Sequence, residues 1–368
     1  MRIRNFFFKW SEMESANPLP RVLVVGSGGV GAMAAFALSQ AKKSSVTLVV
    51  RSDYGKIKDH GYTIESVVHG TLEGWRPEHV CPSVTAAAET GIFDFVVVTT
   101  KNIPDGQATC EDIVRPAVTC GHTTLVLIQN GIGIEEPMFD AFPGCAVLSG
   151  VLLIGLAYKD GVVKHLHKDR LYLAPFDHEE INGMAQTELF AKIYQNSDPL
   201  LNTVIVELSA RRSRWEKLVN NAVFNPVTAL TGLDINRCQI NGANETVFSP
   251  AMDEVIAIAA SDGVEIDPSA KSRFLHVADG SFFASSMLVD LRKGQLVEVE
   301  VIVGNVLRIA QRNNVLAPVL ATLYLLLRMV QFRTKESLGM IHMNEKDYVG
   351  HSSDDYPAIF AALNNKHS

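Results

Sequence analysis

The chain has 368 residues, enough for two or three domains, and its 47% apolar and 20% charged residues are typical of a folded globular protein. The formal net charge of −7 argues against a nucleic-acid-binding surface, and no apolar run reaches the about twenty residues of a membrane-spanning helix. The five cysteines form no Cys-x-x-Cys pair, so we expect no metal site, no disulfide framework and a reducing, cytoplasmic location.

Residues 1–20 are expected to be an N-terminal extension that precedes the folded part. Three basic residues stand among three phenylalanines in this extension, as they do in mitochondrial presequences. Glu12 and Glu14 follow at once, however, and such presequences avoid acidic residues. Two interpretations therefore stay open: an extension without a targeting role, and a mitochondrial presequence.

Residues 21–207 are predicted to form an α/β domain. Residues 22–25 are a wholly apolar run, and residues 46–50, 95–99 and 124–128 resemble it, as strands that are buried on both faces would. An Ala- and Leu-rich stretch over residues 32–40 indicates a helix. Because strands and helical stretches alternate, we expect a doubly wound parallel sheet of the Rossmann type, covered by helices. Turn signals at Asp160-Gly161 predict antiparallel strands within residues 158–175, near the edge of that sheet.

From about residue 208 onward the strand signals fade and helical periodicity dominates. Three stretches are predicted helices: residues 215–230, 250–261 and 316–332. We therefore expect an all-helical domain over residues 208–333. Residues 294–304 are ambiguous, since their valines favour a strand while their neighbours are helical. Residues 334–368 are polar and weakly patterned, and we expect a surface appendage there.

A glycine-rich loop follows the first predicted strand and opens the first predicted helix. It matches the pattern Gly-x-Gly-x-x-Gly and consists of Gly26, Ser27, Gly28, Gly29, Val30 and Gly31. In this setting glycine permits a tight turn and lets the backbone approach a pyrophosphate, which also meets the free N–H groups of the helix N-terminus. We therefore predict a dinucleotide-binding site at this loop.

The end of the second predicted strand bears on which dinucleotide binds. NAD-binding sites usually place an acidic residue there to accept hydrogen bonds from the ribose, whereas this strand ends in Arg51. Because arginine can bind a 2′-phosphate, we expect NADP(H) as the cofactor. The nearby Asp53 keeps NAD(H) open as the alternative.

Two polar loops follow later strands of the predicted sheet. Lys101 ends a Thr-Thr-Lys sequence after one strand, and Asn130 lies in a Gln-Asn-Gly-Ile-Gly loop after the next. Because ligands of open parallel sheets bind beyond the carboxyl ends of the strands, both side chains are candidates to contact cofactor or substrate. Ordinary turn chemistry would also explain them, since Asn-Gly is a common turn pair.

A polar stripe marks the predicted helix at residues 215–230. Lys217, Asn221 and Asn225 are successive i, i+4 neighbours on a helix whose other residues are largely apolar. Pro226 is expected to kink this helix near Asn225. The stripe faces either solvent or a cleft. In a cleft, burial would lower the pKa of Lys217 toward neutrality and let it act as a general acid toward a carbonyl oxygen.

Taken together and in this order, these motifs resemble the ketopantoate reductase family, the 2-dehydropantoate 2-reductases. The more specific matches are WEKLVNNAVFNPVTAL at residues 215–230 and SSMLVDLRKGQLVEVEVIVGN at residues 285–305, and the resemblance covers about residues 21–325. It implies a Rossmann-type domain, an all-helical C-terminal domain and NADPH-dependent reduction of a 2-keto acid. It also implies that residues 297–310 are helical despite their valines.

The resemblance assigns roles by position. It makes Lys217 the general acid, and it places Ser286 at the carboxylate of the substrate. The implied substrate-binding residues are Asn130, Asn221, Asn225 and Ser286. The implied cofactor contacts, beside the glycine loop, are Arg51, Lys101, Asn130 and Glu298.

Two departures from the family bear on the substrate. Leu152-Leu153 stands where the family commonly has two threonines, which makes the expected cleft more apolar, and Val297 and Glu300 stand where Thr and Asp are common. The expected function is NADPH-dependent reduction of 2-dehydropantoate to pantoate, on the route to pantothenate and coenzyme A. We further expect a homodimer with no membrane association. Two alternatives stay open: reduction of another, more apolar 2-keto acid or ketone, and NADPH sensing without turnover.

Overall fold

The computed structural model describes residues 18–356 and residue 358. The presequence interpretation falls on residues outside this described part, as does the end of the expected C-terminal appendage. Among the described residues, no helix combines the length and the apolar character that crossing a membrane requires. Among the same residues, no three His, Cys, Asp or Glu side chains are grouped so as to hold a metal ion.

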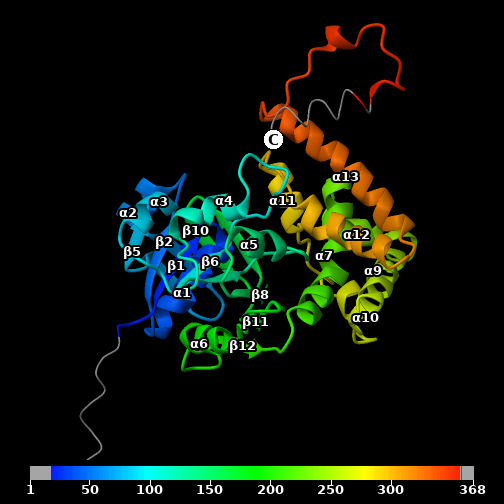
Figure 1. The fold of residues 1–368 in the computed structure, drawn as a ribbon. Coiled ribbons are helices and arrows are strands. Elements are labelled where there is room, and N and C mark those ends of the chain that lie inside the picture. The colour runs from blue at the N-terminus through cyan, green and yellow to red at the C-terminus, as the bar shows by residue number, and fades with distance from the viewer. Residues whose placement is uncertain (1–17, 357, 359–368) are drawn as a thin grey trace, which may run out of the picture.

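The main sheet has eight strands in the order β12-β11-β8-β7-β6-β1-β2-β5 (Figure 1). They are β1 (Arg21–Val25), β2 (Ser45–Val49), β5 (His79–Cys81), β6 (Phe95–Val98), β7 (Thr124–Leu127), β8 (Val147–Leu153), β11 (Asp169–Pro175) and β12 (Asn202–Val206). Neighbours pair in parallel except β8 and β11, which are antiparallel. Every residue of β6 and β7 is buried, which is why these strands are apolar except for Thr124. The predicted doubly wound sheet is confirmed.

Helices cover both faces of this sheet. On one face pack α1 (Gly29–Ala41), α2 (Tyr54–His60) and α6 (Met184–Tyr194), and on the other α3 (Val84–Ala88), α4 (Cys110–Val114) and α5 (Glu136–Ala141). The odd and even residues of β1 divide between the two faces: Leu23 belongs to one apolar cluster, and Val22 and Val24 belong to the other. This alternation is what a strand covered on both sides requires.

A second, four-stranded sheet has the order β4-β3-β10-β9. Its members are β3 (Tyr62–Ser66), β4 (Gly70–Trp75), β9 (Leu156–Lys159) and β10 (Val162–His165). The predicted hairpin at Asp160 and Gly161 joins β9 and β10, and both turn residues have positive φ, as a two-residue hairpin requires. Its expected place at the edge of the parallel sheet was wrong, because β10 pairs instead with the distant β3. The same expectation is confirmed for β11, which lies within residues 158–175, pairs antiparallel with β8 and neighbours the edge strand β12.

The region after β12 is helical, as expected. It contains α7 (Arg211–Thr231), α8 (Ile235–Ile240), α9 (Ser249–Ser261), α10 (Ala270–Leu275), α11 (Ser286–Arg292), α12 (Asn305–Arg312) and α13 (Pro318–Ser337). Helix α7 is central and packs against α9, α10, α11 and α13. It continues through Pro226 to Thr231, so the proline does not end the helix. Near the proline, the Thr228 hydroxyl donates to the carbonyls of Phe224 and Asn225. Helix α13 runs beyond residue 333, where the helical domain was expected to end.

The valine-rich segment before α12 is helical from residue 299 onward. A π-helical turn over Glu300–Gly304 leads directly into α12. Val297 and Glu298 precede the helix, so the helix expected over residues 297–310 begins slightly later. The reason is Gln331 of α13, whose side-chain amide accepts from the N–H of Val297 and donates to its carbonyl, both at 3.1 Å. β-Propensity did not decide the structure here, since these valines are buried against helices.

Candidate active site

The glycine loop connects β1 to α1, as the sequence predicted. Gly26 has a φ of +114°, and a Cβ on Gly31 would lie 1.8 Å from the Gly26 carbonyl oxygen, so neither position accepts a side chain. A Cβ on Gly28 would meet nothing within 4 Å, and this residue caps the N-terminus of α1. Main-chain atoms are therefore exposed to an approaching ligand at a helix N-terminus, which fits the pyrophosphate of a dinucleotide. Ser27, Gly29 and Val30 complete the loop.

A buried carboxylate, Glu298, joins two loops at the carboxyl ends of the strands. Its Oε2 lies 3.4 Å from Lys101 Nζ and accepts a hydrogen bond from Asn130 Nδ2 at 3.2 Å. Its Oε1 accepts from the main-chain N–H of Asn102 at 3.2 Å. Asp290 of α11 forms the shorter ion pair with Lys101, at 2.8 Å. Glu298 thus fixes the loops after β6 and β7 relative to the helical region.

Lys101 stays charged in this network. Burial acts to lower the pKa of Lys101, but the Glu298 and Asp290 carboxylates outweigh it and hold that pKa above its usual range. A permanently charged ammonium next to the glycine loop suits contact with an anionic cofactor and not proton transfer near neutral pH.

Lys217 lies on α7 and faces the cleft, so the polar stripe is not a solvent-facing one. Its Nζ donates a hydrogen bond to the main-chain carbonyl of Leu152, at the end of β8, at 2.8 Å. Burial, aided by the positive charges of Arg214 and Lys101 and opposed by Glu298, lowers the pKa of Lys217 to about 8. A lysine with this pKa can release a proton near neutral pH.

A small cavity brings several of the predicted residues together. Val30 of the glycine loop, Lys101, Asn130, Lys217 and Glu298 all line it. The rest of its wall comes from Thr99, Thr100, Ile128, Gln129, Gly150 and Leu152. The dinucleotide loop, the candidate acid and the candidate cofactor contacts therefore share one site at the carboxyl ends of β1, β6, β7 and β8.

The other predicted substrate-binding residues are not part of the cavity wall, and one of them contacts it. Asn221 is part of the network, because its Nδ2 donates to Asn130 Oδ1 at 3.4 Å. Asn225 is 4% exposed, and its Nδ2 has no hydrogen-bond partner among the described residues. An unsatisfied buried donor is costly, so a ligand oxygen here would stabilise the site. Ser286 opens α11 with an exposed side chain and does not line the small cavity.

Arg51 and Asp53 follow the end of β2, where the adenosine ribose of a dinucleotide would bind. Arg51 is exposed, and no described residue forms a hydrogen bond or ion pair with its guanidinium. Asp53 Oδ2 accepts a 2.6 Å hydrogen bond from the hydroxyl of Tyr158. Asp53 is therefore already hydrogen-bonded to another side chain, whereas the guanidinium of Arg51 is not.

Sequence reasoning missed two residues that hold the site. Asp290 pairs with Lys101, and Arg214 is 2% exposed and hydrogen-bonds to the loop that carries Asn130. The one available signal for Arg214 was a second cation one turn before Lys217 on a largely apolar helix. Nothing in the local sequence distinguished Asp290 from a surface carboxylate.

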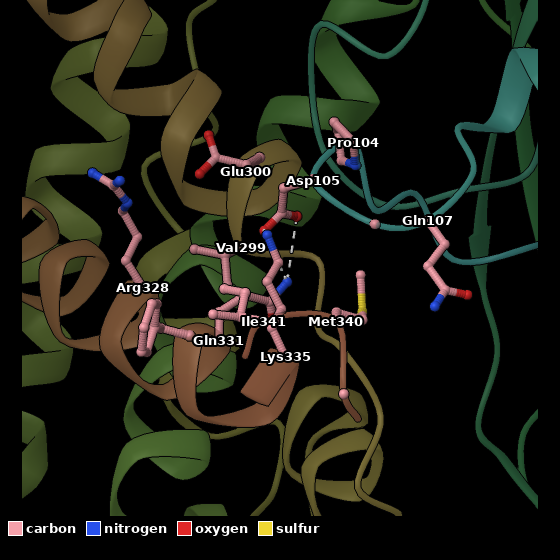
Figure 2. A pocket seen from close by; sticks show the side chains of 13 residues that line it. Pro104, Asp105, Gln107, Val299, Glu300, Arg328, Gln331, Lys335, Met340 and Ile341 are labelled. Atoms are coloured by element: carbon pink, nitrogen blue, oxygen red, sulfur yellow. Dashed lines mark hydrogen bonds and ion pairs between the residues drawn. The ribbon is translucent and has the colours of Figure 1, made fainter. Parts of the chain in front are cut away.

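A larger cavity of about 700 Å³ lies between the loop at Pro104–Gln107, the residues Val299 and Glu300, and α13 (Figure 2). Asp105 faces Gln331 and Lys335 there, and it forms an ion pair with Lys335 at 2.8 Å. Gln331 donates to Asp105 at 3.4 Å and also holds the main chain of Val297, the residue before Glu298.

Comparisons with known proteins agree with this geometry. Residues 22–178 match the family model described as ketopantoate reductase PanE/ApbA, and residues 209–331 match the model of its C-terminal part. An uncharacterised protein of Saccharomyces cerevisiae is 42% identical over 351 residues, covering 89% of this chain and 98% of the yeast protein.

Two solved structures share the fold. The 2-dehydropantoate 2-reductase from Methylococcus capsulatus has a TM-score of 0.70 at 29% identity, covering 85% of this chain and 97% of that one. A D-mandelate dehydrogenase solved with NADH and anilino(oxo)acetate has a TM-score of 0.73 at 17% identity, covering 86% and 99%. This chain therefore belongs to the ketopantoate reductase family, whose members are pyridine-nucleotide-dependent reductases, and it is an oxidoreductase of that type.

Proposed function

We propose that this protein catalyses the NADPH-dependent reduction of a 2-keto acid, with 2-dehydropantoate as the first candidate substrate and pantoate as its product. The observation that carries the proposal is Lys217, whose ammonium lies in the same cavity as the glycine loop and has a pKa lowered to about 8. Carbonyl reduction needs both a hydride donor and a proton donor, and this cavity can supply the second beside a site that suits the first.

When bound, the nicotinamide would supply a hydride to C2 of the keto acid. Lys217 Nζ would give its proton to the C2 oxygen, and the Leu152 carbonyl would hold the ammonium in place meanwhile. Asn221 and the unpartnered amide of Asn225 would bind polar groups of the substrate. Ser286, at the N-terminus of α11, would bind the substrate carboxylate.

The preference for NADPH over NADH is part of the proposal. The 2′-phosphate would bind Arg51, whose guanidinium has no partner in the described part of the chain. Asp53, the acidic residue that would favour NADH, is held by Tyr158 instead. Gly26 to Gly31, Lys101, Asn130 and Glu298 would complete the cofactor site.

The test is NADPH oxidation at 340 nm by the full-length protein. We expect turnover of 2-dehydropantoate with NADPH, slower turnover with NADH, and a kcat lower by about 10² to 10⁴ after Lys217→Ala. Fluorescence titration should find NADPH binding intact in that variant. Binding of NADPH without turnover of any 2-keto acid would favour a sensing protein over a reductase.

A second candidate substrate class is a more apolar 2-keto acid or ketone. Leu152, Ile128 and Val30 form an apolar part of the cavity wall next to Lys217. A substrate whose C3 substituent lacks the hydroxyl of 2-dehydropantoate would suit that wall better. The same assay, run with a panel of bulkier 2-keto acids, separates the two classes.

We also propose the domain roles expected from the sequence, with residues 21–207 binding the cofactor and residues 208–333 binding the substrate.

A cytoplasmic location fits the five cysteines, all of which are free thiols. Leu325, Leu326 and Met329 are exposed apolar residues of α13, and we propose that this face contributes to a homodimer. Light scattering of the purified protein tests that state.

A further inference from the structure

Arg214 is a buried arginine that binds main-chain carbonyls where a carboxylate would be usual. Its Nη1 donates to the carbonyls of Gln129 and Gly131, at 3.1 and 2.9 Å, and its Nη2 donates to that of Leu127, at 3.2 Å. Its Nε donates to Ser149 Oγ at 2.8 Å. One side chain of α7 thus binds the end of β7, the loop after it and the middle of β8.

The two carbonyls that share Nη1 flank Asn130. The Gln129 carbonyl belongs to the peptide group just before Asn130 and the Gly131 carbonyl to the one just after Gly131, so the short segment that carries Asn130 is held at both ends. The side chain of Asn130 then donates to Glu298 and accepts from Asn221, so its orientation is set as well. Arg214 lies one turn before Lys217 on α7, so the same helix holds both the Asn130 loop and the candidate acid.

We infer that Arg214 is a positioning residue for reduction: its guanidinium holds the Asn130 loop against α7 at the separation where Asn130 and Lys217 face one substrate. This inference rests on the proposed function. A guanidinium suits the task because its planar fork can donate several hydrogen bonds in fixed directions, which an ammonium on a flexible chain does less well.

The charge of Arg214 has a second effect, on Lys217. Arg214 and Lys101 are the positive groups that face Lys217, and Glu298 is the negative one, while Asp290 pairs with Lys101. Arg214 itself has Glu135 as its acidic neighbour. Removing the Arg214 charge therefore favours the charged form of Lys217 and moves the alkaline limit of activity to higher pH.

Two variants separate position from charge. Arg214→Lys keeps the positive charge but loses the planar guanidinium with its several N–H donors. We therefore expect kcat to fall about tenfold or more while the alkaline limb of the pH profile stays in place. Arg214→Met loses both, so the same fall in kcat should come with a limb shifted to higher pH. Both variants should still bind NADPH, since Arg214 itself does not line the cavity and the glycine loop is unchanged.

Arg212→Met is the matched control, because Arg212 lies on the same helix and is exposed. It should match the wild type in kcat, pH profile and Tm. Wild-type kcat and pH profile in Arg214→Met would overturn the inference. If Arg214→Met does not fold, Arg214→Lys decides, and a wild-type kcat there overturns it equally. Absence of turnover in the wild type, or a wild-type kcat in Lys217→Ala, would instead refute the proposed function.

Discussion

The ammonium of Lys217 donates its 2.8 Å hydrogen bond to the main-chain carbonyl of Leu152, not to a side chain. A carbonyl dipole orients the ammonium without adding a negative charge, so burial and the nearby cations still control its acidity. The departure from the family's two threonines at residues 152 and 153 therefore changes the wall beside the acid without removing its hydrogen-bond partner.

The pH dependence of kcat/KM should have an alkaline limb near pH 8. The general acid must be protonated to act, so activity is present below the pKa of Lys217 and falls above it, about tenfold per pH unit. Initial rates of NADPH oxidation between pH 6 and about 10.5 check this. A limb near the ordinary lysine value, about 10.4, would mean that the cleft does not perturb this side chain.

Glu298→Gln should move that limb in the opposite direction to Arg214→Met. The Glu298 carboxylate favours the charged form of Lys217, so its loss should lower the pKa of Lys217 and shift the limb to lower pH. The KM for NADPH should also rise, because the lost charge weakens the contact to Lys101 and the loop after β6. Glu300→Gln is the matched control, since that carboxylate pairs with Arg308 and Tyr324 outside the small cavity. An unmoved limb would contradict the electrostatic account.

Leu152→Thr should change substrate preference and leave the acid intact. The substitution adds a hydroxyl to the wall of the cavity and preserves the carbonyl that holds Lys217. We expect kcat/KM for 2-dehydropantoate to rise relative to apolar 2-keto acids by about tenfold, the size of a typical side-chain hydrogen bond. Leu153→Thr, on the exposed side chain next to it, should leave this ratio unchanged. Equal ratios in the two variants would show that Leu152 does not set specificity.

Arg51→Ala should lower the preference for NADPH over NADH by about tenfold to a hundredfold, since a hydrogen bond to a charged group contributes about 1.5–3 kcal/mol. The KM for NADH should stay close to the wild-type value, because that cofactor lacks the 2′-phosphate. The KM values of both cofactors, measured at saturating keto acid, give the answer. A proportional loss with both cofactors would assign Arg51 a general structural role.

The sequence predicted β1, β2, β6 and β7 because their apolar character follows directly from burial on both faces, and it gave no prediction for β5, β8 and β12. It could not predict which sheet takes the hairpin at Asp160 and Gly161, because that depends on pairing between β10 and β3, which are far apart in the chain. The start of the helix after Val297 likewise depends on Gln331, a residue of another helix.

Within the site, the glycine loop and the polar stripe carry local patterns that motif reasoning detects. Glu298 entered through family resemblance, because a single glutamate near valines has no signature of its own. Arg214 was missed because its hydrogen bonds reach residues 65 to 87 positions away, and an arginine on a helix ordinarily indicates a solvent-exposed face. Contacts between residues so far apart in the chain can be identified only once the fold is known.

The central claim, that Lys217 is the proton donor of a keto-acid reductase, is tested most directly by comparing wild type with Lys217→Ala under saturating NADPH and 2-dehydropantoate. Loss of a general acid costs about 10² to 10⁴ in rate, so kcat should fall by that factor while the Kd of NADPH stays within about twofold. A variant that keeps wild-type kcat would contradict the claim.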